Sequence, residues 1–167
     1  MLGKEWGAML ESYPSAELVS SDGKSRIIVC VYNYEVSQAA LNAAAIDWLI
    51  CRLRVECLDF AGEVDGPYLE SGSILRWQAE AEVLCNTYQA TGWFSAIEPE
   101  LEFKLERDEL NSQQFKVSGH LTTGRRERSA VLSYEFLTDV RCLRNFVEGL
   151  ERLCVSFPAR NHPTSSP

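Results

Sequence analysis

Residues 48–60 read WLICRLRVECLDF, and apolar and charged side chains alternate along this stretch. A period of two is typical of a half-buried antiparallel strand, because successive side chains of a strand point to opposite faces of the sheet. One face carries Leu49, Cys51, Leu53, Val55 and Cys57. The other face carries Arg52, Arg54 and Glu56, and we expect its two arginines to pair with glutamates across the sheet.

Further strands are predicted before this stretch. Residues 26–36 are a β-branched run, which favours a strand. Residues 6–10 and 17–19 are candidates for shorter strands, and Asp22-Gly23 is a typical hairpin turn. The alanine-rich segment 37–45 is either a loop or a short helix.

After the opening stretch, residues 62–67 contain glycine and proline and are predicted to form a turn. Residues 101–106, 115–121 and 131–137 then alternate again, with short links between them. Three such strands in succession indicate an antiparallel meander.

Two stretches show helical spacing instead. The first has apolar residues three and four positions apart, at Ile74, Trp77, Ala81, Leu84 and Tyr88. Ser71 or Ser73 is suited to cap its start and Gly92 to mark its end. The second stripe runs from Leu143 to Cys154, behind Thr138 or Asp139 as the capping residue.

This order of strands, helix, strands and helix predicts an α+β fold. We expect an antiparallel β-sheet of about six strands, with two amphipathic helices packed on one face. The length of 167 residues supports a single domain. We place that domain at residues 1–157 and a flexible C-terminal tail at residues 158–167, where Pro, Ser and Thr accumulate.

The charge balance bears on the kind of partner. The chain has 16 Lys and Arg against 24 Asp and Glu, a net charge of −8 at pH 7. An acidic protein is poorly suited to neutralise phosphates, which argues against nucleic-acid binding and favours a basic partner. No segment approaches the roughly 18 apolar residues of a membrane span, and the N-terminus lacks the apolar core of a signal peptide.

The cysteines and histidines form no recognisable metal-binding or redox motif in the sequence. The six cysteines form no CxxC pair and have no histidine grouped with them, so we expect buried free thiols, no metal and no cofactor in a cytoplasmic protein. His120 is predicted on the polar face of a strand and His162 in the tail. Nucleotide-binding, zinc-hydrolase and serine-hydrolase motifs are missing from the sequence, so no catalytic residue is predicted. The tryptophans of this sequence are more typical of core or sheet-edge packing than of stacking on nucleic-acid bases.

Carboxylates crowd into residues 98–109, at Glu98, Glu100, Glu102, Glu106, Asp108 and Glu109. Three interpretations stay open: a catalytic pair, a solvated face and an acidic binding surface. Alternate residues on one strand face lie about 7 Å apart, near the separation of glycosidase carboxylates. Lys104 and Arg107 lie beside them on a face predicted to be wet, which disfavours the desolvation that catalytic acids need.

Four short motifs follow one another along the chain: Trp48-Leu49, Leu75-Arg76-Trp77, IEPELEF at residues 97–103 and FPAR at residues 157–160. Their succession resembles the WapI-type bacterial immunity proteins, over about residues 46–160. The resemblance implies a small cytosolic antitoxin without enzymatic activity. Its partner would be a basic toxin domain, the nuclease end of a contact-delivered or secreted protein.

The motif residues have expected structural roles. Pro99 fixes an extended entry to a strand, and Leu101 and Phe103 point to the core. Trp48 and Trp77 are expected to pack in the core or at a sheet edge. Because both belong to the resemblance, Glu98 is expected to pair with Arg160 or to bond to a neighbouring backbone group. We expect the toxin contacts to be the carboxylates Glu100, Glu102, Glu106, Asp108 and Glu109.

A second class of function stays open beside this one. In a small-ligand or regulatory binding domain, a pocket between sheet and helices would hold an apolar molecule against Trp48, Trp77 or Tyr88. The sequence leaves the oligomeric state and the identity of the toxin open.

Overall fold

The computed structural model of the chain describes residues 12–35, 47–97, 100–123 and 130–159. These residues form two helices and two four-stranded antiparallel sheets, so the predicted α+β class is confirmed. The strand count is higher than the expected six, and the strands divide between two sheets instead of sharing one. The first sheet contains β1 (Ser15–Val19), β2 (Ser25–Tyr34), β3 (Trp48–Cys57) and β4 (Phe60–Glu70). The second contains β5 (Thr91–Ser95), β6 (Leu101–Arg107), β7 (Gln114–Thr123) and β8 (Ala130–Asp139).

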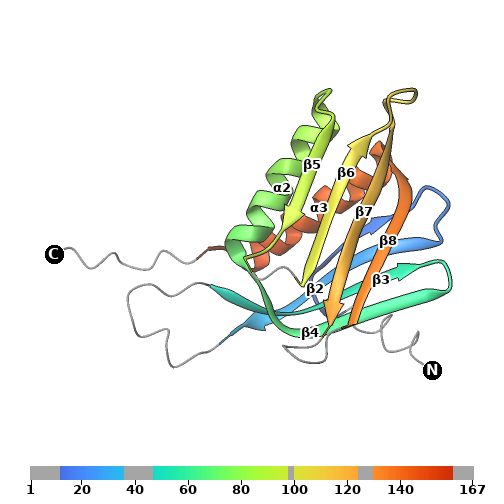
Figure 1. Cartoon of the computed structure of the whole chain (residues 1–167). Coiled ribbons are helices and arrows are strands. Elements are labelled where there is room, and N and C mark those ends of the chain that lie inside the picture. Colours follow the sequence, from blue (N-terminus) through green and yellow to red (C-terminus); the bar gives the residue numbers. More distant parts are fainter. Residues whose placement is uncertain (1–11, 36–46, 98–99, 124–129, 160–167) are drawn as a thin grey trace.

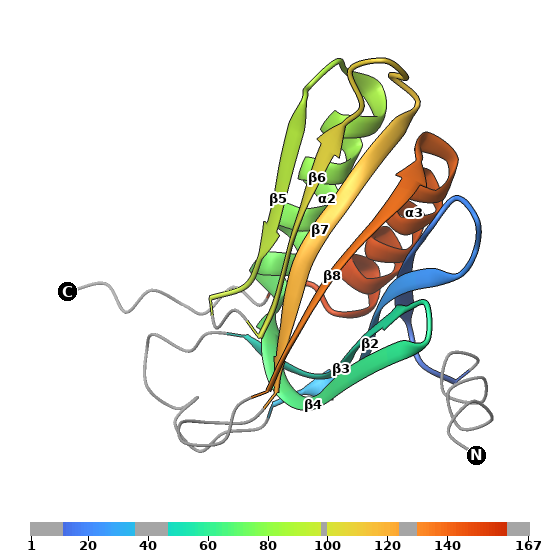
Figure 2. The same cartoon turned by 45° about the vertical axis from the view of Figure 1, so that its right-hand side comes forward.

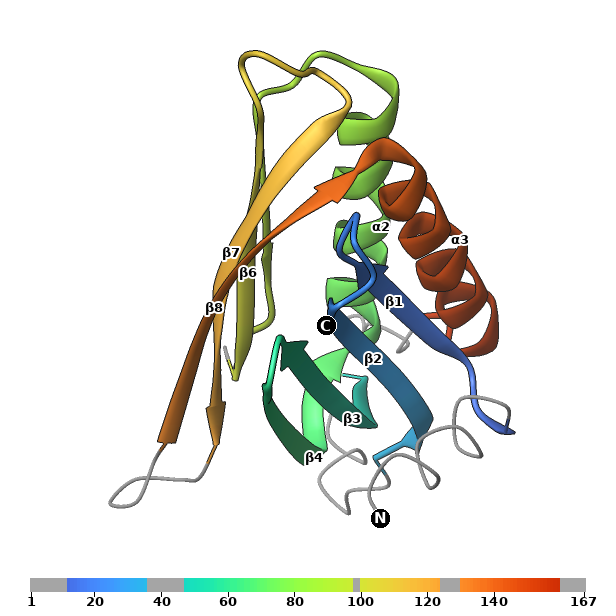
Figure 3. The ribbon, with the colours of Figure 1, turned by 90° about the vertical axis from the view of Figure 1, so that its right-hand side faces the viewer.

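Each sheet turns one apolar face to a shared core. Helix α2 (Ser71–Asn86) connects the sheets, and α3 (Val140–Ser156) follows the last strand. Figures 1 and 2 show both helices covering one face of the second sheet, while the first sheet runs below them. In the side view of Figure 3, the second sheet lies opposite α2, α3 and the first sheet. One buried cluster draws side chains from both sheets and both helices.

The opening strand is confirmed as β3, but the turn predicted after it is wrong. Residues 62–67 lie inside β4, and the chain reverses at Leu58 and Asp59, where Leu58 has a φ of +53°. Strand β4 is an edge strand, where glycine and proline are tolerated. At Gly62 the missing side chain leaves room for the second sheet: a β-carbon there would lie 3.1 Å from Cδ2 of Leu132.

The first helix is confirmed, although both of its predicted ends differ. Glu70 holds the N-cap position in place of Ser71 or Ser73, and the helix ends at Asn86. Tyr88 lies beyond it and is 89% exposed, so it is not part of the buried stripe. Gly92 belongs to β5, a strand that the sequence pattern did not reveal. A β-carbon on Gly92 would lie 2.5 Å from Cδ1 of Leu84, which explains glycine at this crossing of strand and helix.

The second helix begins as predicted. Asp139 is its N-cap, and its side chain accepts a hydrogen bond from the Cys142 amide at 2.8 Å. The predicted strand at residues 17–19 is part of β1, and the β-branched run is β2. The segments 6–10 and 37–45 and most of the predicted tail lie outside the described residues.

Candidate partner-binding surface

The predicted contact residues lie along β6 and the turn that follows it. Glu102 and Glu106 share the outer face of the second sheet, the face turned away from the helices. Glu100 is half-buried just before the strand, where its carbonyl accepts a bond from the Thr122 amide at 2.7 Å. Asp108 and Glu109 lie in the turn after β6. The structure therefore places these five carboxylates along one strand and the turn that follows it. Their role in binding stays a prediction.

Asp108 has a structural task in that turn. Its Oδ1 accepts hydrogen bonds from the amides of Leu110 at 2.7 Å and Asn111 at 2.8 Å. Such bonds are typical of aspartate at turns. Glu109 is exposed and makes no ion pair within the part of the chain that the structure describes.

Lysines interrupt the acidic character of the outer face. Lys104 donates to Glu106 at 2.6 Å, and this hydrogen bond lowers the pKa of the Glu106 carboxyl. Lys116 pairs with Glu135 at 2.9 Å, which raises the pKa of the lysine. Glu102 lies opposite His120 and has no ion pair among the described residues. Among the described residues of this face, the negative charge without an ion pair is therefore that of Glu102.

An open depression of about 480 Å³ lies on the same face. Its rim includes Trp93 and Lys104 on neighbouring strands, and Nζ of Lys104 lies 5.2 Å from the centroid of the indole ring. Trp93 is 59% exposed. Its position at a sheet edge fits the expectation that the tryptophans pack in the core or at a sheet edge. Its exposure arises because β5 is an edge strand, and no sequence pattern predicts that strand. The depression is also lined by Glu102, Ser118, His120 and Ser133.

A second groove, of about 360 Å³, lies between α2 and β5. Ala79, Glu80 and Val83 line it from the helix, and Trp93 and Ser95 line it from the strand. Trp93 therefore borders both hollows.

Of the three aromatic residues expected at a small-ligand pocket, Trp77 borders the groove between α2 and β5, whereas Trp48 and Tyr88 lie elsewhere. Trp77 is 1% exposed, packs edge-on against Phe103 at 5.5 Å between ring centroids, and donates from Nε1 to the Ser95 carbonyl at 3.1 Å. Tyr88 is almost fully exposed, and Trp48 is half-buried at the start of β3. These three side chains do not enclose a common cavity.

Two of the family-like motifs meet in the core, where Trp77 contacts Phe103, and the motif that begins at Phe157 packs against β2. Leu101 and Phe103 are buried as predicted, and Phe103 stacks on Phe94 at 4.6 Å. Tyr34 contacts the ring of Phe157 and donates to the Pro158 carbonyl at 2.7 Å. Glu98, Pro99 and Arg160 lie outside the described residues, so the Glu98–Arg160 pair stays a prediction.

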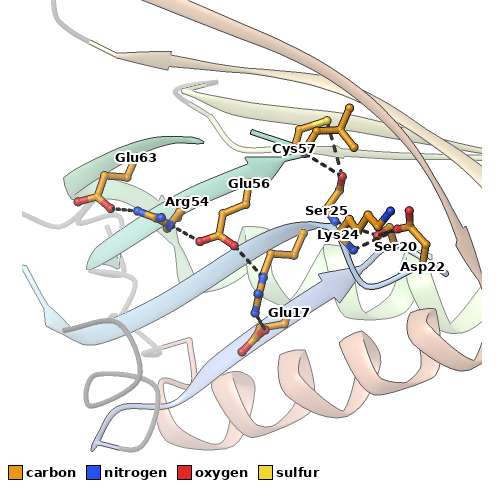
Figure 4. Close-up of polar contacts among 11 residues, drawn as sticks. Glu17, Ser20, Asp22, Lys24, Ser25, Arg54, Glu56, Cys57 and Glu63 are labelled. Carbon is orange, nitrogen blue, oxygen red and sulfur yellow. Dashed lines mark hydrogen bonds and ion pairs between the residues drawn. The ribbon is translucent and has the colours of Figure 1, made fainter. Parts of the chain in front are cut away.

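The outer face of the first sheet carries charge that is already paired (Figure 4). Arg54 bonds to Glu56 and Glu63, both at 2.8 Å, and Arg26 links Glu56 to Glu17. Arg52 pairs with Asp65 on the neighbouring strand. The expected cross-sheet pairing is confirmed for Arg54, and for Arg52 the partner is an aspartate.

Reactive groups are sparse in the described residues. No three His, Cys, Asp or Glu side chains there come together in a way that could hold a metal ion. The described cysteines are free thiols, and burial raises the pKa of Cys30 to about 11 and of Cys51 to about 12. Neither described helix is long and apolar enough to cross a membrane.

Comparison with known proteins places the chain in a family. No curated protein sequence matches it. The family model described as "Immunity protein WapI-like family" matches residues 17–158, which run from β1 through the end of α3. The resemblance carried by the four short motifs is thereby confirmed, and the chain belongs to the WapI-like immunity protein family.

Proposed function

We propose that the protein is an antitoxin that binds and neutralises a cognate nuclease toxin, one that is secreted or delivered by cell contact. The observation that carries this proposal is the family match over residues 17–158. In this proposal the protein acts in the cytoplasm, without catalysis, by covering the toxin. A toxin that cleaves nucleic acid needs a basic surface, and a net charge of −8 suits such a partner.

The proposed contact is the acidic stretch at Glu100, Glu102, Glu106, Asp108 and Glu109. Glu102 and Glu109 carry negative charge that no described ion pair offsets. Complementary charge accelerates association and disfavours wrong partners, which an inhibitor of a lethal enzyme requires.

Co-expression tests the proposal. The test requires a candidate toxin, which we expect to be the C-terminal domain of a large secreted protein encoded immediately upstream. This domain is produced from an inducible promoter. We expect the chain to restore growth, to co-purify with the toxin domain and to suppress nuclease activity of the purified domain. An unrelated immunity protein serves as the control. Continued growth arrest, together with no co-purification, would overturn the antitoxin role.

A further inference from the structure

Strand β5 has a free backbone edge. It is the outermost strand of the second sheet and, within the part of the chain that the structure describes, pairs only with β6, with α2 behind it (Figures 1 and 2). Just before β5, the Ala90 carbonyl accepts a bond from the Arg107 amide at 2.7 Å. Because bonded and non-bonded pairs alternate in an antiparallel ladder, Gly92 and Phe94 bond to β6. Thr91, Trp93 and Ser95 therefore direct their amides and carbonyls away from the sheet.

The backbone carbonyls near the two ends of this edge already accept hydrogen bonds, whereas the backbone groups at its middle do not. Nε2 of Gln89 donates to the Thr91 carbonyl at 2.7 Å, and Nε1 of Trp77 donates to the Ser95 carbonyl at 3.1 Å. Within the described residues, neither the amide nor the carbonyl of Trp93 has a hydrogen-bond partner. Unpaired groups on an edge strand are a template for a further strand, and here the template is centred on one residue.

The side chains around Trp93 suit a protein segment. The indole is exposed and borders both the outer depression and the groove beside α2. Tryptophan is enriched among residues that dominate binding energy at protein interfaces. Glu102 in the depression and Glu80 in the groove have no ion pair among the described residues. The cations that line the same hollows, Lys104 and Arg76, are each paired with a glutamate, so the unpaired charge is negative and favours a basic partner.

We propose that an extended basic segment of the toxin docks on the free edge of β5 and exchanges two backbone hydrogen bonds with Trp93. The residue opposite Trp93 lies beside the indole on the outer face. Its two neighbours point to the other side, into the groove lined by Ala79 and Val83, because side chains alternate along an extended chain. This inference rests on the proposed antitoxin function and identifies the anchoring residue.

A second copy of the chain fits the edge less well. Symmetric pairing about Trp93 would set Thr91 of one copy opposite Ser95 of the other, and both carbonyls are already bonded. It would also bring two copies of Glu80, and their like charges, to one interface.

Two substitutions of Trp93 distinguish the contribution of its indole ring to binding from that of its backbone amide. Trp93→Ala removes the indole and keeps the amide, whereas Trp93→Pro removes both. Proline is tolerated on an edge strand where the lost amide faces outward. Val155→Ala is the control, because Val155 is 77% exposed on α3. With the purified toxin domain, we expect Trp93→Ala to raise Kd at least about tenfold and Trp93→Pro about tenfold more. The control should stay within about twofold.

Hydrogen exchange on the wild-type chain gives a measurement that does not depend on folding of the variants. The Trp93 amide should exchange quickly in the free protein and slowly with the toxin domain bound. If both Trp93 variants bind like wild type and the amide stays unprotected, the docking proposal is wrong while the antitoxin role stands. A free chain that sediments as a dimer, and as a monomer once Trp93→Pro is made, would show a second copy on this edge. Failure of the wild-type chain to bind or neutralise the toxin domain overturns both proposals.

Discussion

Gly149 of α3 lies directly against Ala16 of β1. A β-carbon on residue 149 would sit 2.6 Å from Cα of Ala16 and 3.0 Å from the Ser15 carbonyl. The last helix and the first strand are thus joined by a contact that leaves no room for a methyl group. Because backbone atoms form this contact, a side-chain rotation cannot relieve it.

We expect Gly149→Ala to lower the free energy of unfolding by about 1–3 kcal/mol, although alanine favours helices more than glycine does. Gly72→Ala in α2 is the matched control, because a β-carbon there meets only the end of the Arg76 side chain, at 3.4 Å, and Glu70 at 4.0 Å. The control should be neutral or slightly stabilising. Urea unfolding of both variants checks this, and equal midpoints would contradict the close contact.

The aromatic cluster under β6 predicts a larger loss. Phe103 is 1% exposed and contacts the rings of Phe94, Trp77 and Phe146. Phe103→Ala should cost about 3–5 kcal/mol by leaving a cavity. Tyr88→Ala removes another aromatic ring from an exposed site and should change stability by no more than about 0.5 kcal/mol. Thermal or urea unfolding measures both changes, and a small loss for Phe103→Ala would mean that the core repacks.

The alternating pattern of residues 48–60 and 101–106 is enough to predict β3 and β6, because each of these strands has one buried face. The sequence pattern does not reveal β5, because TGWFS is only five residues long and its glycine is equally typical of a helix end. Residues 62–67 have the composition of a turn, and the contact between Gly62 and Leu132 that favours glycine within β4 arises only when the two sheets pack together. The acidic residues are evident from their crowding in the sequence, and their role in binding stays a prediction. The free edge at Trp93 depends on which strand is outermost, a property of tertiary structure with no local sequence pattern.

Asp139, the N-cap residue of α3, predicts that the stability of the protein depends on pH. The hydrogen bond from the Cys142 amide lowers the pKa of Asp139 below its ordinary value of 3.8. A lowered pKa in the folded state means that Asp139 stabilises the protein above about pH 4 and loses this effect as pH falls through the lowered pKa. Asp139→Ala should cost about 1 kcal/mol at pH 7. Asp139→Asn keeps an acceptor but cannot titrate, so its stability should fall less between pH 4 and 2. Identical slopes for wild type and Asp139→Asn in urea unfolding would contradict the assignment.

The buried thiols predict slow chemical labelling. Cys30 and Cys51 are fully buried, and their raised pKa values of about 11 and 12 keep them protonated at neutral pH. Because the thiolate is the reactive form, a thiol reagent at pH 7.5 should leave both unlabelled in the native protein and label both in urea. Peptide mass spectrometry identifies the labelled positions. Rapid native labelling of Cys51 would show that β3 opens locally.

Charge reversal tests whether the acidic residues contribute to the contact with the toxin. Glu102→Lys with Glu109→Lys should slow association with the toxin domain by about tenfold at low salt and flatten the dependence of the rate on ionic strength. Glu148→Lys with Glu151→Lys is the control, since both glutamates are exposed on α3 and the net charge changes equally. Stopped-flow kinetics separate a local effect from a general effect of net charge. If both double variants slow association to the same extent, only the overall charge matters, and if neither does, the acidic surface is not the contact. Either result leaves the antitoxin role to be decided by growth rescue, because a toxin can also be neutralised through an uncharged interface.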